Sequence, residues 1–241
     1  MPQTPLWAAV QERETLFAAG LSLKTSLTAL GLALLFGVPA AYVLARHAFP
    51  GKALIEGLLD LPMVTPPLIA GMGLLFLLGR DAPVGGLLAD AGLAVLFSPA
   101  GIIVAQAYVA LSVLVRGARA AFEAVDPEVA GVAATLGLSP GWVFLLIEVP
   151  MAGRGLVSAA VLGWARALGE FGATLMVAGA TRLHTETLPM AIYLNIASGE
   201  PGIAIACALV LMTLALTLLL LLRALSSHPA RGPSAHARPA A

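Results

Sequence analysis

Residues 126–150 read DPEVAGVAATLGLSPGWVFLLIEVP. This segment is moderately polar and is punctuated by glycine and proline, whereas the sequence around it forms uncharged apolar runs of about the length that crosses a bilayer. Such runs are too long and too apolar for the core of a soluble domain. A membrane chain that keeps a polar segment between two of them is expected to present that segment to a partner.

The composition also indicates a membrane protein. Of the 241 residues, 59% are hydrophobic and 11% are charged, against about a quarter charged in a typical soluble domain. The 13 basic and 13 acidic residues cancel, so net charge gives no reason to expect a nucleic-acid partner. The single cysteine, Cys207, excludes an internal disulfide, and the four histidines are not spaced as metal ligands. We therefore expect no metal site.

Uncharged windows of about 20 residues are long enough to cross the hydrocarbon core. Reading these windows between the charged residues predicts an all-α integral membrane protein with about five transmembrane helices. Ser98 and Pro99 mark the start of the third helix, because serine caps a helix and proline is tolerated in its first turn. We place a transmembrane domain at residues 17–223, with spans at about 20–45, 57–79, 99–118, 151–178 and 202–223.

Arginine and lysine are distributed unequally between the loops. The loops after the first and third spans and the C-terminal tail carry eight of them, whereas the opposite loops are net acidic. Because positive charge is retained in the cytoplasm, we place the N-terminal segment 1–16 outside the cell and the 123–150 loop inside. Residues 224–241 are rich in proline, serine and alanine and are expected to be a disordered cytoplasmic tail. The N-terminus has no signal-peptide pattern, so we expect the first span to direct insertion.

The segment quoted above carries helix signals rather than the composition of a linker. Asp126 followed by Pro127 starts one helix, and Gly137 ends it. Ser139 followed by Pro140 starts a second helix that leads into the fourth span. Two short helices joined at a glycine predict a compact elbow at the membrane surface.

This elbow resembles the EAA motif of ABC transporter permeases, in which glutamate and two alanines are followed by a glycine and then, ten residues later, by isoleucine, any residue, an apolar residue and proline. The spacing from Gly137 to Ile147, Val149 and Pro150 is the same. Ala133 matches the second alanine of the motif. The resemblance implies that the elbow docks on an ATPase, whereas the alternative is a stable helical pair without that role.

Two positions depart from the motif. Gly131 stands where the glutamate is usual and Val132 stands where the first alanine is usual. Glu128 lies one turn earlier and is the candidate for the missing acid. By the resemblance, the residues expected to couple to the ATPase are Glu128, Ala133, Ala134, Leu136, Gly137, Ser139, Ile147 and Pro150.

Two further stretches resemble the oxyanion branch of these permeases. The first is ARALGEFGATLMVAG at residues 165–179, which is most similar to molybdate permeases and less similar to sulfate and tungstate permeases. The second is RHAFPGKALIEGLLDLPMVTPP at residues 46–67. The resemblance extends over residues 16–223.

The resemblance implies the permease subunit of a binding-protein-dependent molybdate importer, a type I ABC importer of the bacterial plasma (inner) membrane. In such importers a homodimer forms the pathway, two cytoplasmic ABC ATPase subunits dock on the EAA loops, and an extracytoplasmic oxyanion-binding protein supplies the substrate. The chain has no G-x-x-x-x-G-K-[ST] motif. We therefore expect no bound cofactor and no enzymatic activity here, with ATP and Mg on the partner. The alternatives are a tungstate or sulfate permease of the same architecture, or a membrane scaffold subunit without its own pathway.

Prolines interrupt the second span at Pro62, Pro66 and Pro67, and Thr65 lies between them. A proline removes a helix hydrogen bond, and an unpaired backbone group is costly in lipid. This backbone is therefore expected to face protein or water. The stretch either lines the pathway and helps to build its gate, or it only bends a helix that shapes the bundle.

Two charged residues, Arg166 and Glu170, lie inside the fourth span and four residues apart. Charges at this depth are costly and usually face a bundle interior. The interpretation we favour is a salt bridge; the alternative is that Arg166 faces the passing oxyanion. Thr174 either donates to substrate or bonds to a carbonyl of its own helix. Gly172 and Ala173 are small enough to allow close helix packing, which we expect at the dimer axis.

Overall fold

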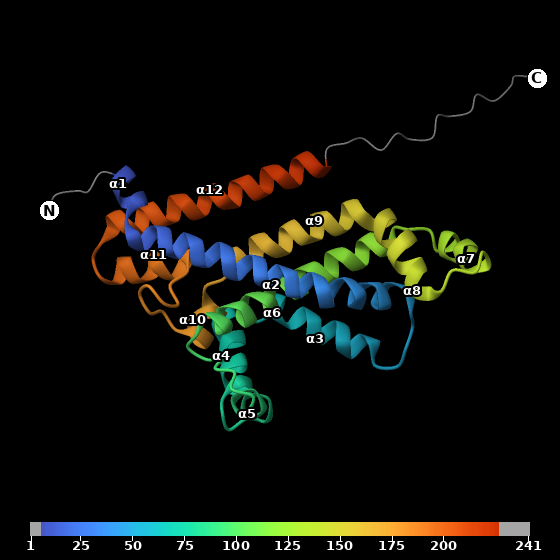
Figure 1. The fold of residues 1–241 in the computed structure, drawn as a ribbon, viewed down its shortest axis with the longest axis horizontal. Coiled ribbons are helices and arrows are strands. Elements are labelled where there is room, and N and C mark those ends of the chain that lie inside the picture. Colours follow the sequence, from blue (N-terminus) through green and yellow to red (C-terminus); the bar gives the residue numbers. More distant parts are fainter. Residues whose placement is uncertain (1–5, 227–241) are drawn as a thin grey trace, which may run out of the picture.

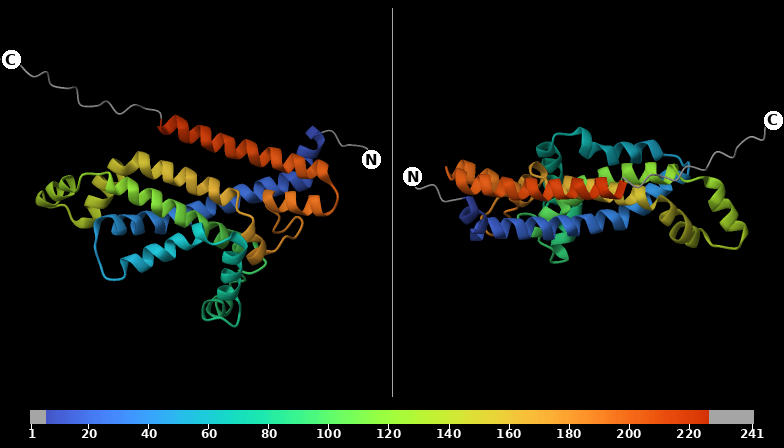
Figure 2. Two further views of the ribbon diagram at one scale, coloured as in Figure 1. Left: turned by 180° about the vertical axis from the view of Figure 1, so that it is seen from behind. Right: turned by 90° about the horizontal axis from the view of Figure 1, so that it is seen from above.

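The computed structural model describes residues 6–226, and this part of the chain is helical without any strand. Four long helices lie side by side along the longest dimension of the molecule, and the shorter helices lie at both ends of this bundle and along one flank (Figures 1 and 2). The elements are α1 (Leu6–Gln11), α2 (Arg13–Arg46), α3 (Lys52–Val64), α4 (Pro67–Leu78), α5 (Pro83–Asp90), α6 (Pro99–Glu123), α7 (Pro127–Thr135), α8 (Pro140–Val143), the π-helical turn η1 (Phe144–Glu148), α9 (Val149–Leu168), α10 (Gly172–Ala178), α11 (Leu188–Ala197) and α12 (Pro201–Ser226).

Four helices in the described part are long and apolar enough to cross a membrane. They are α2, α6, α12 and the continuous helix Pro140–Leu168, which joins α8, η1 and α9. A fifth crossing results if α4 and α5, which are bent by 57° relative to each other, form one broken span. The structure thus agrees with an all-α membrane protein of about five spans.

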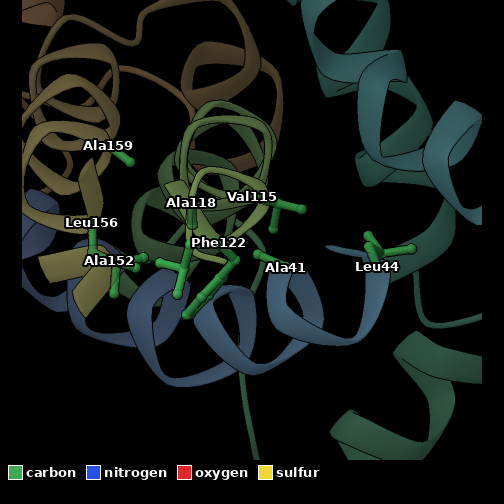
Figure 3. Close-up of a cluster of buried hydrophobic side chains, with 9 residues drawn as sticks. Ala41, Leu44, Val115, Ala118, Phe122, Ala152, Leu156 and Ala159 are labelled. Carbon is green, nitrogen blue, oxygen red and sulfur yellow. The ribbon is translucent and has the colours of Figure 1, made fainter. Parts of the chain in front are cut away.

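Small residues bring the long helices close together. A Cβ atom added to Gly117 of α6 would lie 2.8 Å from the Cβ of Ala159 in α9. Since lipid supplies no hydrophobic force between helices, such close approach and the dispersion contacts that it permits hold a membrane bundle together. Figure 3 shows the resulting cluster, where α2, α6 and α9 meet through Ala41, Leu44, Val115, Ala118, Phe122, Ala152, Leu156 and Ala159.

The second span, which we expected over 57–79 with an interruption at its prolines, is broken at Pro66 and Pro67. It begins earlier, as α3, and ends at Val64; α4 begins after Thr65 and Pro66. Pro66 is extended (φ −54°, ψ 134°), and the last α3 bond is the Thr65 N–H donating to the Leu61 carbonyl at 2.9 Å. Neither Pro66 nor Pro67 has an N–H with which to continue the ladder. The helix therefore stops where the two prolines begin.

The fourth span also differs from the expected helix over 151–178. Its helix begins at Pro140, so the second short helix of the elbow is continuous with the span. It ends at Leu168, and α10 begins only at Gly172. The carboxylate of Glu170 accepts the Ala173 N–H at 2.9 Å. This bond satisfies a backbone N–H in the first turn of α10, which would otherwise have no partner within its helix.

Three further differences concern the ends and the loops. Helices α5 and α11 lie where we expected loops, and α11 has only 10 residues. The first long helix begins at Arg13, inside the segment 1–16. At the C-terminus α12 extends to Ser226, and the remainder of the expected tail at 224–241 lies outside the described residues.

Candidate functional site

The elbow of α7 and α8 projects from one end of the bundle, which we call the α7 end (Figures 1 and 2). Asp126 starts α7, since its Oδ1 accepts the Glu128 N–H at 2.9 Å and Pro127 occupies the first turn. Gly137 follows the helix at φ +89°. The Leu138 N–H donates to the carbonyl of Ala133, five residues earlier, at 3.3 Å. Such a left-handed helix end favours glycine, because any side chain would clash with the backbone.

Large apolar side chains are exposed on the elbow. Val132 on α7 is 60% exposed, and Leu136, the residue directly after α7, is 80% exposed. On the second helix Trp142, Leu145 and Leu146 are each more than half exposed. Large apolar side chains exposed outside the bilayer are typical of an interaction site.

The coupling residues expected from the sequence divide into exposed and buried positions. Ala133 is 6% exposed and packs the elbow, and Ile147 is half-buried. The others lie at the surface: Glu128, Ala134, Leu136, Gly137, Ser139 and Pro150. Gly131, which replaces the usual glutamate, is also at the surface, and a Cβ atom there would meet no atom within 4 Å. The position can therefore accommodate a side chain, and this chain has none.

The second feature is a half-open cavity of about 210 Å³. It lies between the break in the second span, α6 and the end of α9. Four residues that we expected at a pathway line it, and so do three apolar residues that we did not consider. The expected four are Pro62, Thr65, Pro67 and Arg166, and the others are Met63, Val109 and Val113.

Arg166 presents a cation to this cavity, while its partner is withdrawn from it. Nη1 of Arg166 donates to Oε2 of Glu170 at 2.5 Å, and the side chains are 36% and 1% exposed. Oε1 of Glu170 accepts the Ala173 N–H. The favoured salt bridge is therefore present, and it leaves much of the guanidinium facing the cavity. The positive end of the pair is accessible, whereas the negative end is buried in hydrogen bonds.

The remaining pathway candidates do not line the cavity. Pro66 lies within the break and is exposed. Thr174 is fully buried on α10, and its hydroxyl has no hydrogen-bond partner among the described residues. The helix carbonyl bond that we considered for Thr174 is therefore not formed in this part of the chain.

Gly172 and Ala173 do pack closely, but their partner is α4 of the same chain. A Cβ atom on Gly172 would lie 2.8 Å from the Cβ of Pro67, and one on Gly71 would lie 2.7 Å from the Cα of Ala173. These contacts lie within one chain, so the expectation that the small residues serve a dimer axis stays a prediction. They hold the segment after the break, α4, against the segment after Glu170, α10.

A polar cluster occupies the opposite end of the bundle, which we call the α11 end. Glu14 accepts from Arg182 at 2.9 Å and from the side-chain amide of Asn195 at 2.6 Å. Glu186 is fully buried nearby and accepts the Leu183 N–H at 3.0 Å. The pKa of Glu186 is raised to about 7, mainly by burial and also by the neighbouring Glu14, while the Leu183 N–H and Arg182 oppose the shift. These contacts tie the start of α2 to the loop before α11.

Sequence reasoning missed one charged pair at the α7 end. Arg46 was considered only as a loop charge and Glu148 was not considered, but the two form a buried salt bridge. The only signal in the sequence was an acid next to Val149 and Pro150 in an apolar stretch. No group of residues in the described part of the chain is arranged to hold a metal ion.

Comparisons with known proteins match most of the membrane domain. Residues 33–230 match the family described as binding-protein-dependent transport system inner membrane component. The chain is 39% identical to the molybdenum transport system permease protein ModB of Mycobacterium tuberculosis over 209 residues, which are 87% of this chain and 79% of that protein. It is 39% identical to the protein of the same name from Escherichia coli over 205 residues, with 84% and 88% covered.

More distant similarities extend to other importers. The sulfate transport system permease protein CysW of Synechocystis is 33% identical over 217 residues, which are 90% of this chain and 79% of that protein. Among solved structures, a chain of a bacterial alginate ABC transporter in complex with an alginate pentasaccharide-bound periplasmic protein superposes with a TM-score of 0.66. That match has 19% identity and covers 92% of this chain and 81% of the other. The fold is therefore that of an ABC importer permease.

Proposed function

The chain belongs to the family of binding-protein-dependent transport system inner membrane components, and we propose that it is the permease subunit of an ATP-driven molybdate importer. The relatives named for molybdenum transport match it over most of both chains, which supports this substrate. One structural observation carries the proposal for the pathway. Arg166 faces a cavity at the break in the second span.

The chemistry of the cavity suits brief contact with an oxyanion. The guanidinium of Arg166 offers planar N–H donors of the kind that bind oxyanions, and Glu170 already neutralises part of its charge at 2.5 Å. A transport path must bind weakly enough to release the ion. The apolar side chains of Met63, Val109 and Val113 add no further charge to the cavity. We assign Pro62, Thr65, Pro66 and Pro67 to the gate beside it.

One continuous helix connects the elbow with this cavity. Trp142 and Arg166 both lie on the helix Pro140–Leu168, and 24 residues of helix span about 36 Å. A displacement of the elbow therefore displaces Arg166 without any intervening loop. Such coupling requires two alternative arrangements of the bundle, and rigid packing of the long helices allows them to move together.

We assign the exposed face of the elbow as the docking surface for two cytoplasmic ATPase subunits. Leu136 and Trp142 supply apolar area, and Glu128 supplies the only acid in the first turn of α7. Because Gly131 has no side chain where the motif carries glutamate, docking depends more on shape and backbone contacts. ATP and Mg are bound and used by those subunits, and this chain carries out no hydrolysis.

The same assignment orients the chain in the bacterial inner membrane. Five basic residues lie on the helices in the part of the bundle toward the α7 end: Arg46, Lys52, Arg116, Arg119 and Arg154. Positive charge favours the cytoplasm, so the elbow and the C-terminus are placed inside and the N-terminus outside. The pathway is completed by a second copy of the chain, and an extracytoplasmic binding protein delivers the oxyanion at the α11 end.

Uptake of labelled molybdate tests the substrate. In cells that lack every other high-affinity molybdate system, deleting this gene should abolish uptake at low molybdate concentration, and restoring it should recover uptake. Unchanged uptake after deletion would show the molybdate assignment to be wrong. It would also favour the scaffold alternative if sulfate and tungstate uptake were unchanged.

Sulfate is the second candidate, because the sulfate permease of Synechocystis is 33% identical to the chain over 90% of its length. An excess of unlabelled sulfate or tungstate distinguishes the candidates. If the chain serves a molybdate importer, excess sulfate should reduce the uptake of labelled molybdate only slightly. If it serves a sulfate importer, excess sulfate should abolish most of that uptake. Tungstate is nearly equal to molybdate in size and charge, so its competition is decided by the binding protein.

A further inference from the structure

Three segments that are far apart in the sequence meet at one arginine. Nε of Arg46 donates to Oε1 of Glu148 at 3.0 Å, and Nη2 donates to Oε2 at 2.7 Å. Nη2 also donates to the carbonyl of Val125 at 2.9 Å. Arg46 ends α2, Val125 precedes the elbow, and Glu148 follows it. The arginine therefore bonds to both ends of the elbow at once; we call these three residues the clamp.

The clamp is buried, so its charged groups must stay paired with each other. The side chain of Arg46 is 13% exposed and that of Glu148 is 1% exposed. Two parallel bonds fix both the distance and the plane of the two groups. An unpaired charge at such a site is strongly unfavourable, so the two groups are held together as long as the surrounding helices keep their packing.

Three aromatic rings pack together on elements next to the clamp. The ring of Tyr42, one turn before Arg46, lies 4.7 Å from that of Phe144 and 5.4 Å from that of Phe122. Phe122 is fully buried. These rings come from α2, η1 and α6, the elements that meet at the clamp. Their contacts join α2, η1 and α6 close to the clamp.

Glu148 is also the last residue of the π-helical turn. In this turn the Val149 N–H donates to the Phe144 carbonyl, five residues back, and Pro150 has no N–H to give to the turn before it. A widened turn next to a proline is a weak point of the helix, where a push on α8 tends to bend the chain rather than move α9. The bond from Arg46 reinforces this weak point.

We propose that Arg46 and Glu148 are positioning residues that make the elbow, α2 and α6 move as one body when the ATPase displaces the elbow. Without the clamp, displacement of α8 is absorbed at the π-helical turn. This inference rests on the proposed function, since it concerns how ATP hydrolysis is coupled to transport. It assigns no contact with substrate or with ATP to either residue.

The test compares transport with ATP consumption in one preparation. The complete complex is reconstituted in lipid vesicles with its ATPase and its molybdate-loaded binding protein, and molybdate uptake and ATP hydrolysis are measured together. Glu148→Gln keeps the shape of the side chain and removes its charge. We expect the molybdate transported per ATP hydrolysed to fall about fivefold or more, which is the size of a typical coupling between sites, while hydrolysis without substrate continues.

A matched control is Glu123→Gln, which makes the same chemical change in an exposed pair. Glu123 ends α6 and pairs with Arg119 at 2.7 Å, with 47% of its side chain exposed. Exposed pairs contribute little, so the ratio should stay at the wild-type value. Arg46→Lys keeps the charge but loses the two-bond geometry, and it should give an intermediate ratio.

A wild-type ratio in an assembled Glu148→Gln complex would overturn the proposal. If that variant does not assemble, Arg46→Lys decides in the same way, since an unchanged ratio contradicts a positioning role. A wild-type complex that imports no molybdate, sulfate or tungstate contradicts the proposed function itself. The two failures are therefore distinguishable.

Discussion

Gly71 of α4 lies directly against Ala173 of α10, so close that a Cβ atom on Gly71 would be 2.7 Å from the Cα of Ala173. The neighbouring atom belongs to the backbone and cannot rotate away. This contact joins the two segments that follow the breaks in the second and fourth spans. The wall beside the Arg166 cavity therefore depends on a position that only glycine fits.

Gly71→Ala should loosen this contact. Overpacking of a close-packed site costs about 1–3 kcal/mol, and we expect a lower midpoint of thermal unfolding and reduced molybdate uptake. Gly73→Ala on the same helix is the control, because a Cβ atom at Gly73 would have no neighbouring atom within 4 Å. Equal thermal midpoints for the two variants would contradict the role given to Gly71.

Arg166→Gln should reduce uptake without preventing assembly. A hydrogen bond to a charged group contributes about 1.5–3 kcal/mol, which corresponds to about tenfold or more in rate. Arg154→Gln on the same helix is the control, since Arg154 is exposed at the α7 end. Uptake is measured in vesicles at equal amounts of complex. Normal uptake by Arg166→Gln would show that the arginine only pairs with Glu170.

Gly137→Pro should leave the protein inserted but uncouple it from its ATPase. Gly137 has φ +89°, whereas proline is restricted to a φ of about −65°. The helix end must rearrange and move Leu136, so we expect substrate-dependent ATP hydrolysis to fall about fivefold or more. Gly131→Ala, in open space without a positive φ, should behave as wild type. Full substrate-dependent hydrolysis in Gly137→Pro would contradict the docking role of the elbow.

Glu186 should make stability depend on pH. Its pKa is raised by burial from 4.5 to about 7, with Glu14 adding to the effect and Arg182 and the Leu183 N–H opposing it. Between these two values the folded state holds a proton that the unfolded state has released, so stability falls as pH rises through this window.

The measurement is the midpoint of thermal unfolding in detergent at several pH values between 4.5 and about 7. We expect the midpoint to decrease with pH in the wild type and to change less in Glu186→Gln, because glutamine does not titrate in this range. Identical slopes for the two proteins would rule out Glu186 as the source.

Much of the architecture could be predicted from residues that act locally. Asp126 and Pro127 start α7, and Ser98 and Pro99 start α6, because capping and proline geometry operate within one turn. The length of uncharged runs predicted the long helices. The motif spacing from Gly137 to Pro150 predicted the family, which the comparisons confirm.

The predictions that differed from the structure depended on neighbours. The break after Leu168 exists because the Glu170 carboxylate caps α10 and pairs with Arg166, and apolar composition alone continued that helix to residue 178. Helix α11 is too short to be recognised as a span. The small residues at Gly172 and Ala173 indicated close packing but not which helix would approach them.

The sequence by itself determined that this is an all-helical membrane protein of a known transport family, with an elbow between two spans, because hydrophobicity, capping and motif spacing are properties of short stretches. Only the tertiary structure decided that Arg166 shares a cavity with Pro62, Thr65 and Pro67, and that Arg46 binds Glu148. The partners of each such contact lie about a hundred residues apart in the chain. Helix packing brings them together, and that packing depends on the shape of many side chains at once.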